Sequence, residues 1–152
     1  MPKHGNYSHI KCYFNSKINS ESKLLRKFAT LQITNYSDFA TNLTNQELDT
    51  LNSKLSEKII SCIENNEQIY KNDEDEYNLI FYAKNEKHAR YRLEYIVKTI
   101  EETNFDIQIN LFAVGVNCTI DDNFNIIEAQ KIARNLLDEA TYLEKVVIYN
   151  EQ

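Results

Sequence analysis

The residues of this chain best suited to chemistry are four consecutive acidic residues at positions 73–76, which lie between two strand-like segments. Carboxylate oxygens are the ligands that Mg²⁺ prefers, usually together with the phosphates of a nucleotide. The alternative is an ordinary solvated hairpin tip. A hard cation also needs a ligand from a second element, so both interpretations stay open, with Asp75 and Glu76 as candidate metal ligands.

A second polar segment, residues 34–38, follows directly after an apolar strand predicted over residues 28–33. Its Thr, Asn, Ser and Asp side chains can hydrogen-bond nearby backbone groups and so end a strand. Strand ends are common ligand sites in sheets that carry helices. We therefore take Asn35, Tyr36 and Asp38 as candidate nucleotide-binding residues.

The remaining pattern predicts the elements that position these two segments. Thr44 and Glu47 form a capping box, so a helix should begin near residue 44. Its apolar stripe consists of Leu48, Leu51, Leu55, Ile59 and Ile63. The other predicted elements are a hairpin of strands 68–71 and 77–82, a helix over 85–102, a strand over 107–116, a helix capped by Asp121 or Asp122, and a strand over 145–149.

This order of elements, β-α-β-β-α-β-α-β, is that of a ferredoxin-like palm extended by one unit. We expect an α+β domain over residues 28–150, with a central, mostly antiparallel sheet and helices packed on it. Residues 1–27 are interpreted as an N-terminal arm or linker, in which 21–27 could form a connecting helix. The plan also predicts that the acidic tip lies near residues 35–38 at one end of the sheet.

The charge and composition of the chain make several classes of partner and binding site improbable. The 152 residues carry a net charge of −6, which disfavours nucleic acid or an anionic membrane surface as the main partner. No apolar run is long enough to span a bilayer, so we expect a cytoplasmic domain without membrane contact of its own. With only two glycines, the chain cannot form a glycine-rich phosphate loop. Its three cysteines are isolated in sequence, which indicates ordinary thiols rather than a disulfide framework or a zinc site.

The segments 32–36 (QITNY) and 73–77 (DEDEY) resemble the two motifs of the GGDEF domain, D-x-D-x-F and G-G-D-E-F. The longer stretches ITNYSDF and QELDTLNS resemble the modified GGDEF domain of cyclic-di-AMP phosphodiesterases of the GdpP/YybT type. Residues 113–116 and Ala129-Gln130 also fit that pattern, so the resemblance covers residues 28–149. Class III nucleotidyl cyclases share the palm, and Lys71 and Asp75 fall on their pattern.

The departures from the GGDEF pattern bear on activity. Gln32 stands where an active cyclase has its leading metal-binding aspartate, and acidic residues replace both hairpin glycines. Ala40 replaces one base-reading residue, whereas Asp49 matches the other. The resemblance thus implies a degenerate domain without diguanylate cyclase activity. It also implies binding of a purine nucleotide (ATP or GTP) and weak ATP hydrolysis, with Asp75 and Glu76 on Mg²⁺ or Mn²⁺.

The same resemblance implies a parent protein. Its members carry transmembrane helices and a PAS domain before this domain and a DHH/DHHA1 phosphodiesterase after it, which implies a homodimer anchored in the cell membrane. Two other hypotheses stay open. One is a divergent nucleotidyl cyclase or palm polymerase that uses Asp38, Lys71 and Asp75, with Arg134 as a transition-state cation. The other is a ligand-free dimerisation or interaction module.

Overall fold

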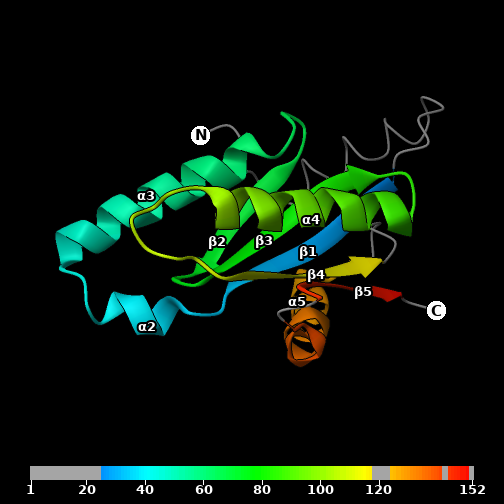
Figure 1. Ribbon diagram of the computed structural model, residues 1–152. Coiled ribbons are helices and arrows are strands. Elements are labelled where there is room, and N and C mark those ends of the chain that lie inside the picture. Colours follow the sequence, from blue (N-terminus) through cyan, green and yellow to red (C-terminus); the bar gives the residue numbers. More distant parts are fainter. Residues whose placement is uncertain (1–24, 118–123, 142–143, 151–152) are drawn as a thin grey trace.

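The computed structural model describes residues 25–117, 124–141 and 144–150, which form one five-stranded sheet with helices on both faces (Figure 1). The strand order is β2-β3-β1-β4-β5. Every pairing is antiparallel except β4 with β5, which is parallel. The elements are β1 (Leu25–Ile33), α2 (Tyr36–Ala40), α3 (Asn45–Ser61), β2 (Gln68–Asp73), β3 (Glu76–Ala83), α4 (Glu86–Glu102), β4 (Leu111–Asn117), α5 (Ile126–Leu136), a 3-10 turn (Leu137–Glu139) and β5 (Val146–Asn150). The predicted α+β palm, with its mostly antiparallel sheet, is confirmed.

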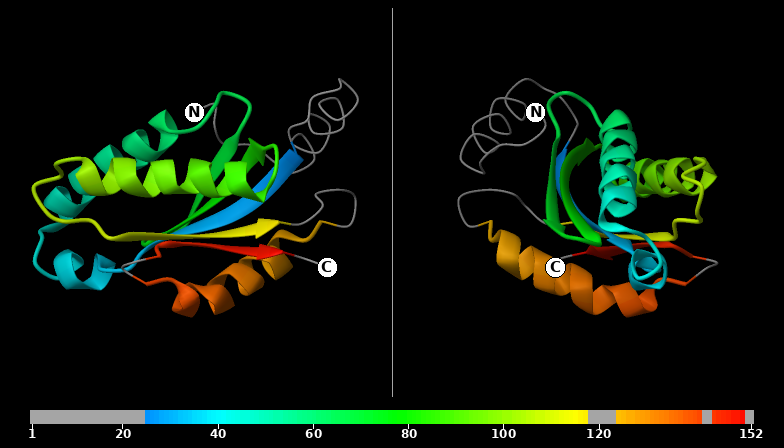
Figure 2. Two further views of the ribbon diagram at one scale, coloured as in Figure 1. Left: turned by 45° about the vertical axis from the view of Figure 1, so that its right-hand side comes forward. Right: turned by 90° about the vertical axis from the view of Figure 1, so that its left-hand side faces the viewer.

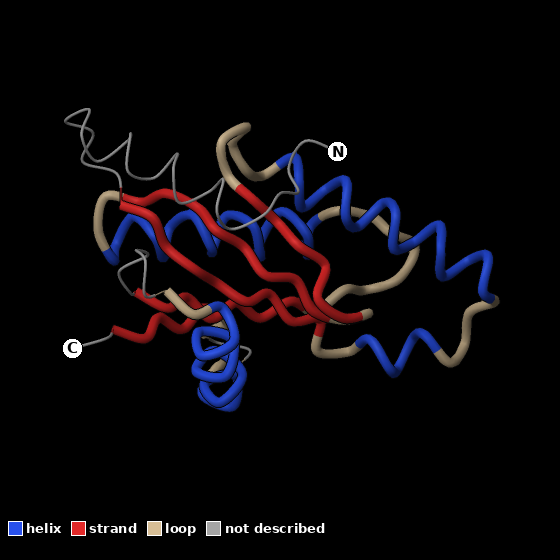
Figure 3. The backbone as a smooth tube through the Cα atoms, turned by 180° about the vertical axis from the view of Figure 1, so that it is seen from behind, coloured by secondary structure: helices blue, strands red, loops and turns tan. Residues whose placement is uncertain are grey.

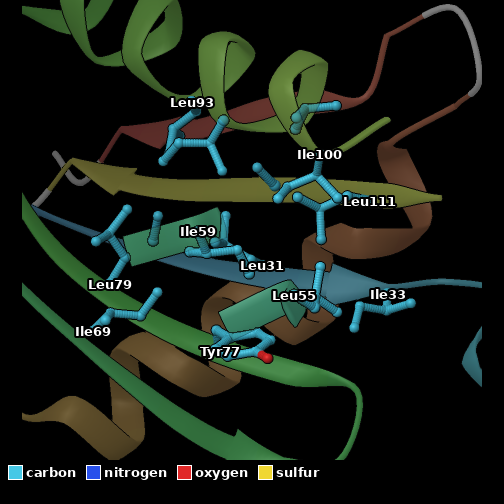
Figure 4. Packing of buried hydrophobic residues seen from close by; sticks show 14 of the residues in the cluster. Leu31, Ile33, Leu55, Ile59, Ile69, Tyr77, Leu79, Leu93, Ile100 and Leu111 are labelled. Carbon is cyan, nitrogen blue, oxygen red and sulfur yellow. The ribbon is translucent and has the colours of Figure 1, made fainter. Parts of the chain in front are cut away.

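Helices α3 and α4 cover one face of the sheet and α5 covers the other (Figure 2), and a cluster of buried apolar residues fills each of the two layers. On one face, α3 contributes Leu55 and Ile59 and α4 contributes Leu93 and Ile100 to the main core (Figure 4). On the other face, α5 packs through Ala129 and Ala133, whose small side chains allow a close approach to the sheet.

No helix in the described part of the chain is long and apolar enough to cross a membrane.

Each of the three long helices begins directly after a residue whose side chain caps its N-terminus. Thr44 Oγ1 accepts from Glu47 N at 3.1 Å and Glu47 Oε1 accepts from Thr44 N at 2.9 Å, so the predicted capping box is formed. Asn85 likewise caps α4, close to the predicted start. The third long helix differs from prediction, because its cap is Asn125, whose side chain accepts from Ile127 N and Glu128 N. Asp121 and Asp122 lie outside the described residues.

Several other boundaries differ from the sequence-based prediction, including the end of β2, which reaches Asp73 and so includes the first of the four acidic residues. Strand β1 begins at Leu25, so residues 25–27 belong to the sheet rather than to a helix; the rest of the 1–27 arm lies outside the described residues. A short helix, α2, begins within the predicted 34–38 turn. Strand β4 begins at Leu111 rather than 107. Just before β4, the Asn35 side chain donates to Gln108 O at 2.8 Å and accepts from Asn110 N at 3.0 Å. These backbone groups are therefore not available for the strand pairing that a longer β4 would need.

The His88 side chain makes a hydrogen bond at the N-terminus of α4 that should depend on pH. Lys84 N donates to His88 Nδ1 at 2.9 Å, while His88 N donates to Asn85 Oδ1 at 2.8 Å. Desolvation by burial lowers the pKa of His88, and the positive charges of Arg92 and Lys84 lower it further. The folded chain therefore takes up the His88 proton less readily than the unfolded chain.

Stability should consequently decrease as the pH falls through the ordinary histidine pKa, about 6.5, because the unfolded state then binds more protons. We expect a lower urea midpoint at pH 5.5 than at pH 7.5. In His88→Gln this decrease should be smaller, while the histidines at positions 4 and 9 are unchanged. Identical pH profiles of the wild type and the variant would contradict the assignment.

Candidate functional site

The tip of the β2–β3 hairpin lies against the end of β1 (Figure 3). The backbone N–H of Ile33 donates to Asp75 O at 2.8 Å, and the Tyr36 hydroxyl donates to Glu74 Oε2 at 3.1 Å. The predicted meeting of residues 73–76 with residues 35–38 is therefore confirmed. This juxtaposition brings carboxylates, a tyrosine and the end of the central strand to one edge of the sheet.

On the α5 side of this edge, the carboxylates are bound by neutral and positive partners. Gln32 Nε2 donates to Asp75 Oδ2 at 2.7 Å. Glu76, which is buried, accepts from Arg134 Nε at 3.0 Å and from Arg134 Nη2 at 2.5 Å. Asn72 Nδ2 adds a third bond to Glu76 at 2.6 Å. The hydrogen bond with Glu76 is the main cause that raises the pKa of Arg134, so this guanidinium stays charged.

These contacts leave few lone pairs for a metal. Both oxygens of Glu76 accept from Arg134, and one oxygen of Asp75 accepts from Gln32. Among the described residues, no three His, Cys, Asp or Glu side chains gather as a metal centre would need. A cation at Glu76 would therefore have to displace Arg134.

On the α3 side of the edge lies a tyrosine cluster, which we define as Tyr36, Asn52, Ser56, Lys71 and Tyr77. The hydroxyls of Tyr77 and Ser56 are 2.9 Å apart, and Asn52 lies beside the Tyr36 hydroxyl, where it acts to lower the pKa of that group. Lys71 Nζ lies 5.8 Å from the centre of the Tyr77 ring. Desolvation by burial is the main cause that raises the pKa of both tyrosines, so they remain neutral hydrogen-bonding groups at neutral pH.

Solved structures share this arrangement of strands and helices. A GGEEF domain of a diguanylate cyclase from Vibrio cholerae aligns with a TM-score of 0.69 and 13% identity, over 96% of this chain and 95% of that chain. The GGDEF domain of DgcB from Caulobacter crescentus, in complex with c-di-GMP, gives 0.68 and 11%, over 97% and 96%. The chain has the GGDEF fold. Scans against protein-family models and curated proteins find no match.

Within this GGDEF fold, the predicted nucleotide-binding residues occupy different environments. Both ends of the Asn35 amide are bonded to the 108–110 backbone, so this side chain has a structural task. Tyr36 is half-buried in the tyrosine cluster, and Lys71 is exposed beside it. Asp38 and Asp49 are exposed on α2 and α3. The structure thus brings Tyr36 and Lys71 to the tyrosine cluster, and their role in binding a nucleotide stays a prediction.

Sequence reasoning missed two members of the cluster. Asn52 and Ser56 are spaced by four residues on α3 and lie outside the apolar stripe that the sequence predicts for this helix. Their half-buried state depends on how α3 crosses the hairpin, which periodicity alone does not specify. Arg134, considered only for a divergent cyclase, proves to be the ion-pair partner of Glu76.

A cavity of about 430 Å³ lies between α3 and the loop that follows α4. Its lining residues are Leu43, Thr44, Gln46, Glu47, Thr50, Leu51, Lys54, Phe105, Asp106 and Ile107. None of them belongs to the predicted site or to the tyrosine cluster. We therefore place the candidate site at the sheet edge, where the strand end and the hairpin tip meet.

Proposed function

We propose that this GGDEF-fold domain is a regulatory module without cyclase activity. The observation that carries the proposal is the hydrogen bond from Gln32 to Asp75. By sequence resemblance, Gln32 stands where an active cyclase has an aspartate that binds metal. An amide nitrogen is a donor, so it occupies an oxygen of Asp75 and adds no anionic ligand of its own.

We further propose that the parent protein is a cyclic-di-AMP phosphodiesterase of the GdpP type. In it, this domain would connect a PAS domain with a DHH/DHHA1 domain, on the cytoplasmic side of a membrane-anchored homodimer. The basis is the match of ITNYSDF and QELDTLNS to that family's modified domain. A precedent for a larger chain is the Vibrio cholerae LapD S helix-GGDEF-EAL structure, bound to c-di-GMP. Its TM-score is 0.68 at 16% identity, over 97% of this chain and 37% of that chain.

The ligand that we propose for the sheet edge is a purine nucleotide, ATP or GTP, with weak hydrolysis of ATP as the expected activity. The partly exposed ring of Tyr36 offers an aromatic surface for a base, since Tyr77 itself is buried, and the exposed Lys71 supplies a positive charge for phosphate. Asp38 and Asp49 are available to sugar or base donors. Because Asp73 and Glu74 are exposed and negative, they should repel the phosphates, so affinity should be low.

In this proposal, a divalent ion enters only with the nucleotide. Mg²⁺ binds largely through waters and substrate phosphates, and Asp75 keeps one oxygen that no described contact uses. Manganese, which also favours oxygen ligands, should substitute. Metal alone should therefore bind poorly.

Calorimetric titration with ATP and GTP, with and without Mg²⁺, tests the binding. We expect dissociation constants near the millimolar range, measurable only with Mg²⁺. Glu74→Gln should tighten binding about threefold to fivefold, because one repulsive contact worth about 1 kcal/mol in water is removed. Lys71→Ala should weaken it by a similar factor.

The matched controls are Glu57→Gln and Lys54→Ala, which make the same charge changes on α3 away from the hairpin. Neither control should alter the affinity. Absence of heat at millimolar nucleotide, or equal effects of the site and control variants, would rule out the nucleotide site and leave the interaction module as the better description.

A further inference from the structure

Helix α4 exposes two tyrosines on the face turned away from the sheet. Tyr91 is 66% exposed and Tyr95 is 52% exposed. In the described part of the chain, the strongly exposed large hydrophobic residues are Leu25, Tyr91, Tyr95, Ile127 and Tyr149. Tyr91 and Tyr95 are one helical turn apart, so they form a continuous aromatic surface. Tyrosine is enriched at the centre of protein interfaces and is a frequent hot-spot residue there.

The orientation of this face is fixed by the packing of α4 on the opposite side. Leu93, Ile96 and Ile100 are fully buried against the sheet. A helical rotation of 100° per residue then directs positions 87, 91, 94, 95, 98 and 102 outward, and all six are exposed. We call these six residues the α4 face.

The charges on the α4 face are arranged unevenly along the helix. Lys87 lies near its N-terminal end, and Glu102 lies at its C-terminal end. Lys98 and Glu102 are 4.0 Å apart with side chains 73% and 68% exposed, so this pair is weak and available to other partners. A parallel pairing of two copies would set Lys87 against Lys87. An antiparallel pairing brings opposite ends together.

In one antiparallel register, every residue of the α4 face lies opposite a residue of complementary chemistry on the second copy. When Lys87 opposes Glu102 of a second copy, Tyr91 opposes Lys98 and Glu94 opposes Tyr95, because the helical rise is the same in both helices. The first contact is an ion pair. The second places an ammonium over an aromatic ring, and the third places a carboxylate beside a tyrosine hydroxyl. In this register no two like charges lie directly opposite each other.

We propose that the α4 face is a self-association surface through which two copies of this chain pair antiparallel about a two-fold axis. Each residue contact then occurs twice, as an isologous interface requires. One helix per copy buries roughly 1,000 Å², at the low end for specific interfaces, so the dimer should be weak. This pairing does not depend on nucleotide binding at the sheet edge.

Sedimentation equilibrium of the full chain, from about 10 μM to 1 mM protein, tests the pairing. We expect a reversible monomer–dimer equilibrium with a dissociation constant in the range of about 10 μM to 1 mM. Tyr91→Ser combined with Tyr95→Ser should weaken it by about tenfold or more, since interface tyrosines are frequent hot spots. Both positions are exposed, so the circular dichroism spectrum and thermal midpoint should remain those of the wild type.

Exchanging the two opposed charges, Lys87 and Glu102, tests the proposed register more specifically than the tyrosine substitutions do. Lys87→Glu and Glu102→Lys should each weaken the dimer, whereas the two changes in one chain should restore it, because the reversed pair forms again in both halves. The matched control is Lys54→Glu with Glu57→Lys on α3, which should leave association unchanged. A monomer at every concentration, a dimer unaffected by the tyrosine changes, or a charge exchange without recovery would each overturn the proposal.

Discussion

Replacing Arg92 by leucine should lower the free energy of unfolding by about 3–5 kcal/mol, the loss expected when one partner of a buried ion pair is removed. The Glu67 side chain is 1% exposed, and its carboxylate accepts from Arg92 at 2.6 and 2.7 Å. It also accepts from the backbone N–H groups of Tyr82 and Glu64, each at 2.9 Å. Without Arg92, this negative charge would remain buried with only neutral donors.

Arg92 has contacts that add to the loss. It donates to Tyr82 O at 3.0 Å, and its guanidinium lies 5.7 Å from the centre of the Phe81 ring. The hydrogen bond with Glu67 is the main cause that raises the pKa of Arg92, so this guanidinium stays charged. Because Glu67 lies directly before β2, the pair also fixes the loop that leads into the hairpin.

Urea denaturation provides the measurement, at protein concentrations well below the dissociation constant proposed for the α4-face dimer, with Lys98→Leu as the control. Lys98 belongs to the exposed pair with Glu102, so its loss should cost about 1 kcal/mol or less. Adding Glu67→Gln to Arg92→Leu should recover part of the stability, because the amide oxygen still accepts a backbone N–H and carries no charge. An Arg92→Leu cost no larger than that of Lys98→Leu would contradict the importance of the pair.

Much of this fold follows from local sequence signals. The Thr44–Glu47 capping box and the apolar stripe of α3 are short-range features, so they specify the helix without knowledge of the rest. The order of elements then places the hairpin tip beside the end of β1, as the bond from Ile33 to Asp75 confirms. The capping box and the stripe depend on sequence neighbours, whereas the position of the hairpin tip follows from the order of the elements in the palm plan.

The features that sequence reasoning missed depend on distant partners. Strand β4 starts late because Asn35 binds the backbone more than 70 residues away, at Gln108 and Asn110. Arg134 meets Glu76 across 58 residues, and only the packing of α5 on the sheet brings them together. No periodicity encodes such pairs, so the chemistry of Glu76 could not be inferred from the acidic run alone.

The purified chain should make no cyclic dinucleotide from GTP or ATP, with either Mg²⁺ or Mn²⁺. The leading strand offers the neutral Gln32, whose amide already binds Asp75, and Glu76 is held by Arg134. Phosphate approach is further opposed by the exposed Asp73 and Glu74. Nucleotide binding, weak ATP hydrolysis and regulation remain compatible with these contacts, because Mg²⁺ can be held largely by waters and nucleotide phosphates.

Chromatography of overnight reactions with GTP and with ATP tests the central claim of a cyclase-inactive regulatory domain. A diguanylate cyclase serves as the positive control, and Asp75→Ala as the site variant. We predict that neither the wild type nor Asp75→Ala forms a cyclic dinucleotide, while a small amount of ADP is compatible with weak hydrolysis. A cyclic dinucleotide that forms with the wild type and disappears with Asp75→Ala would contradict the claim.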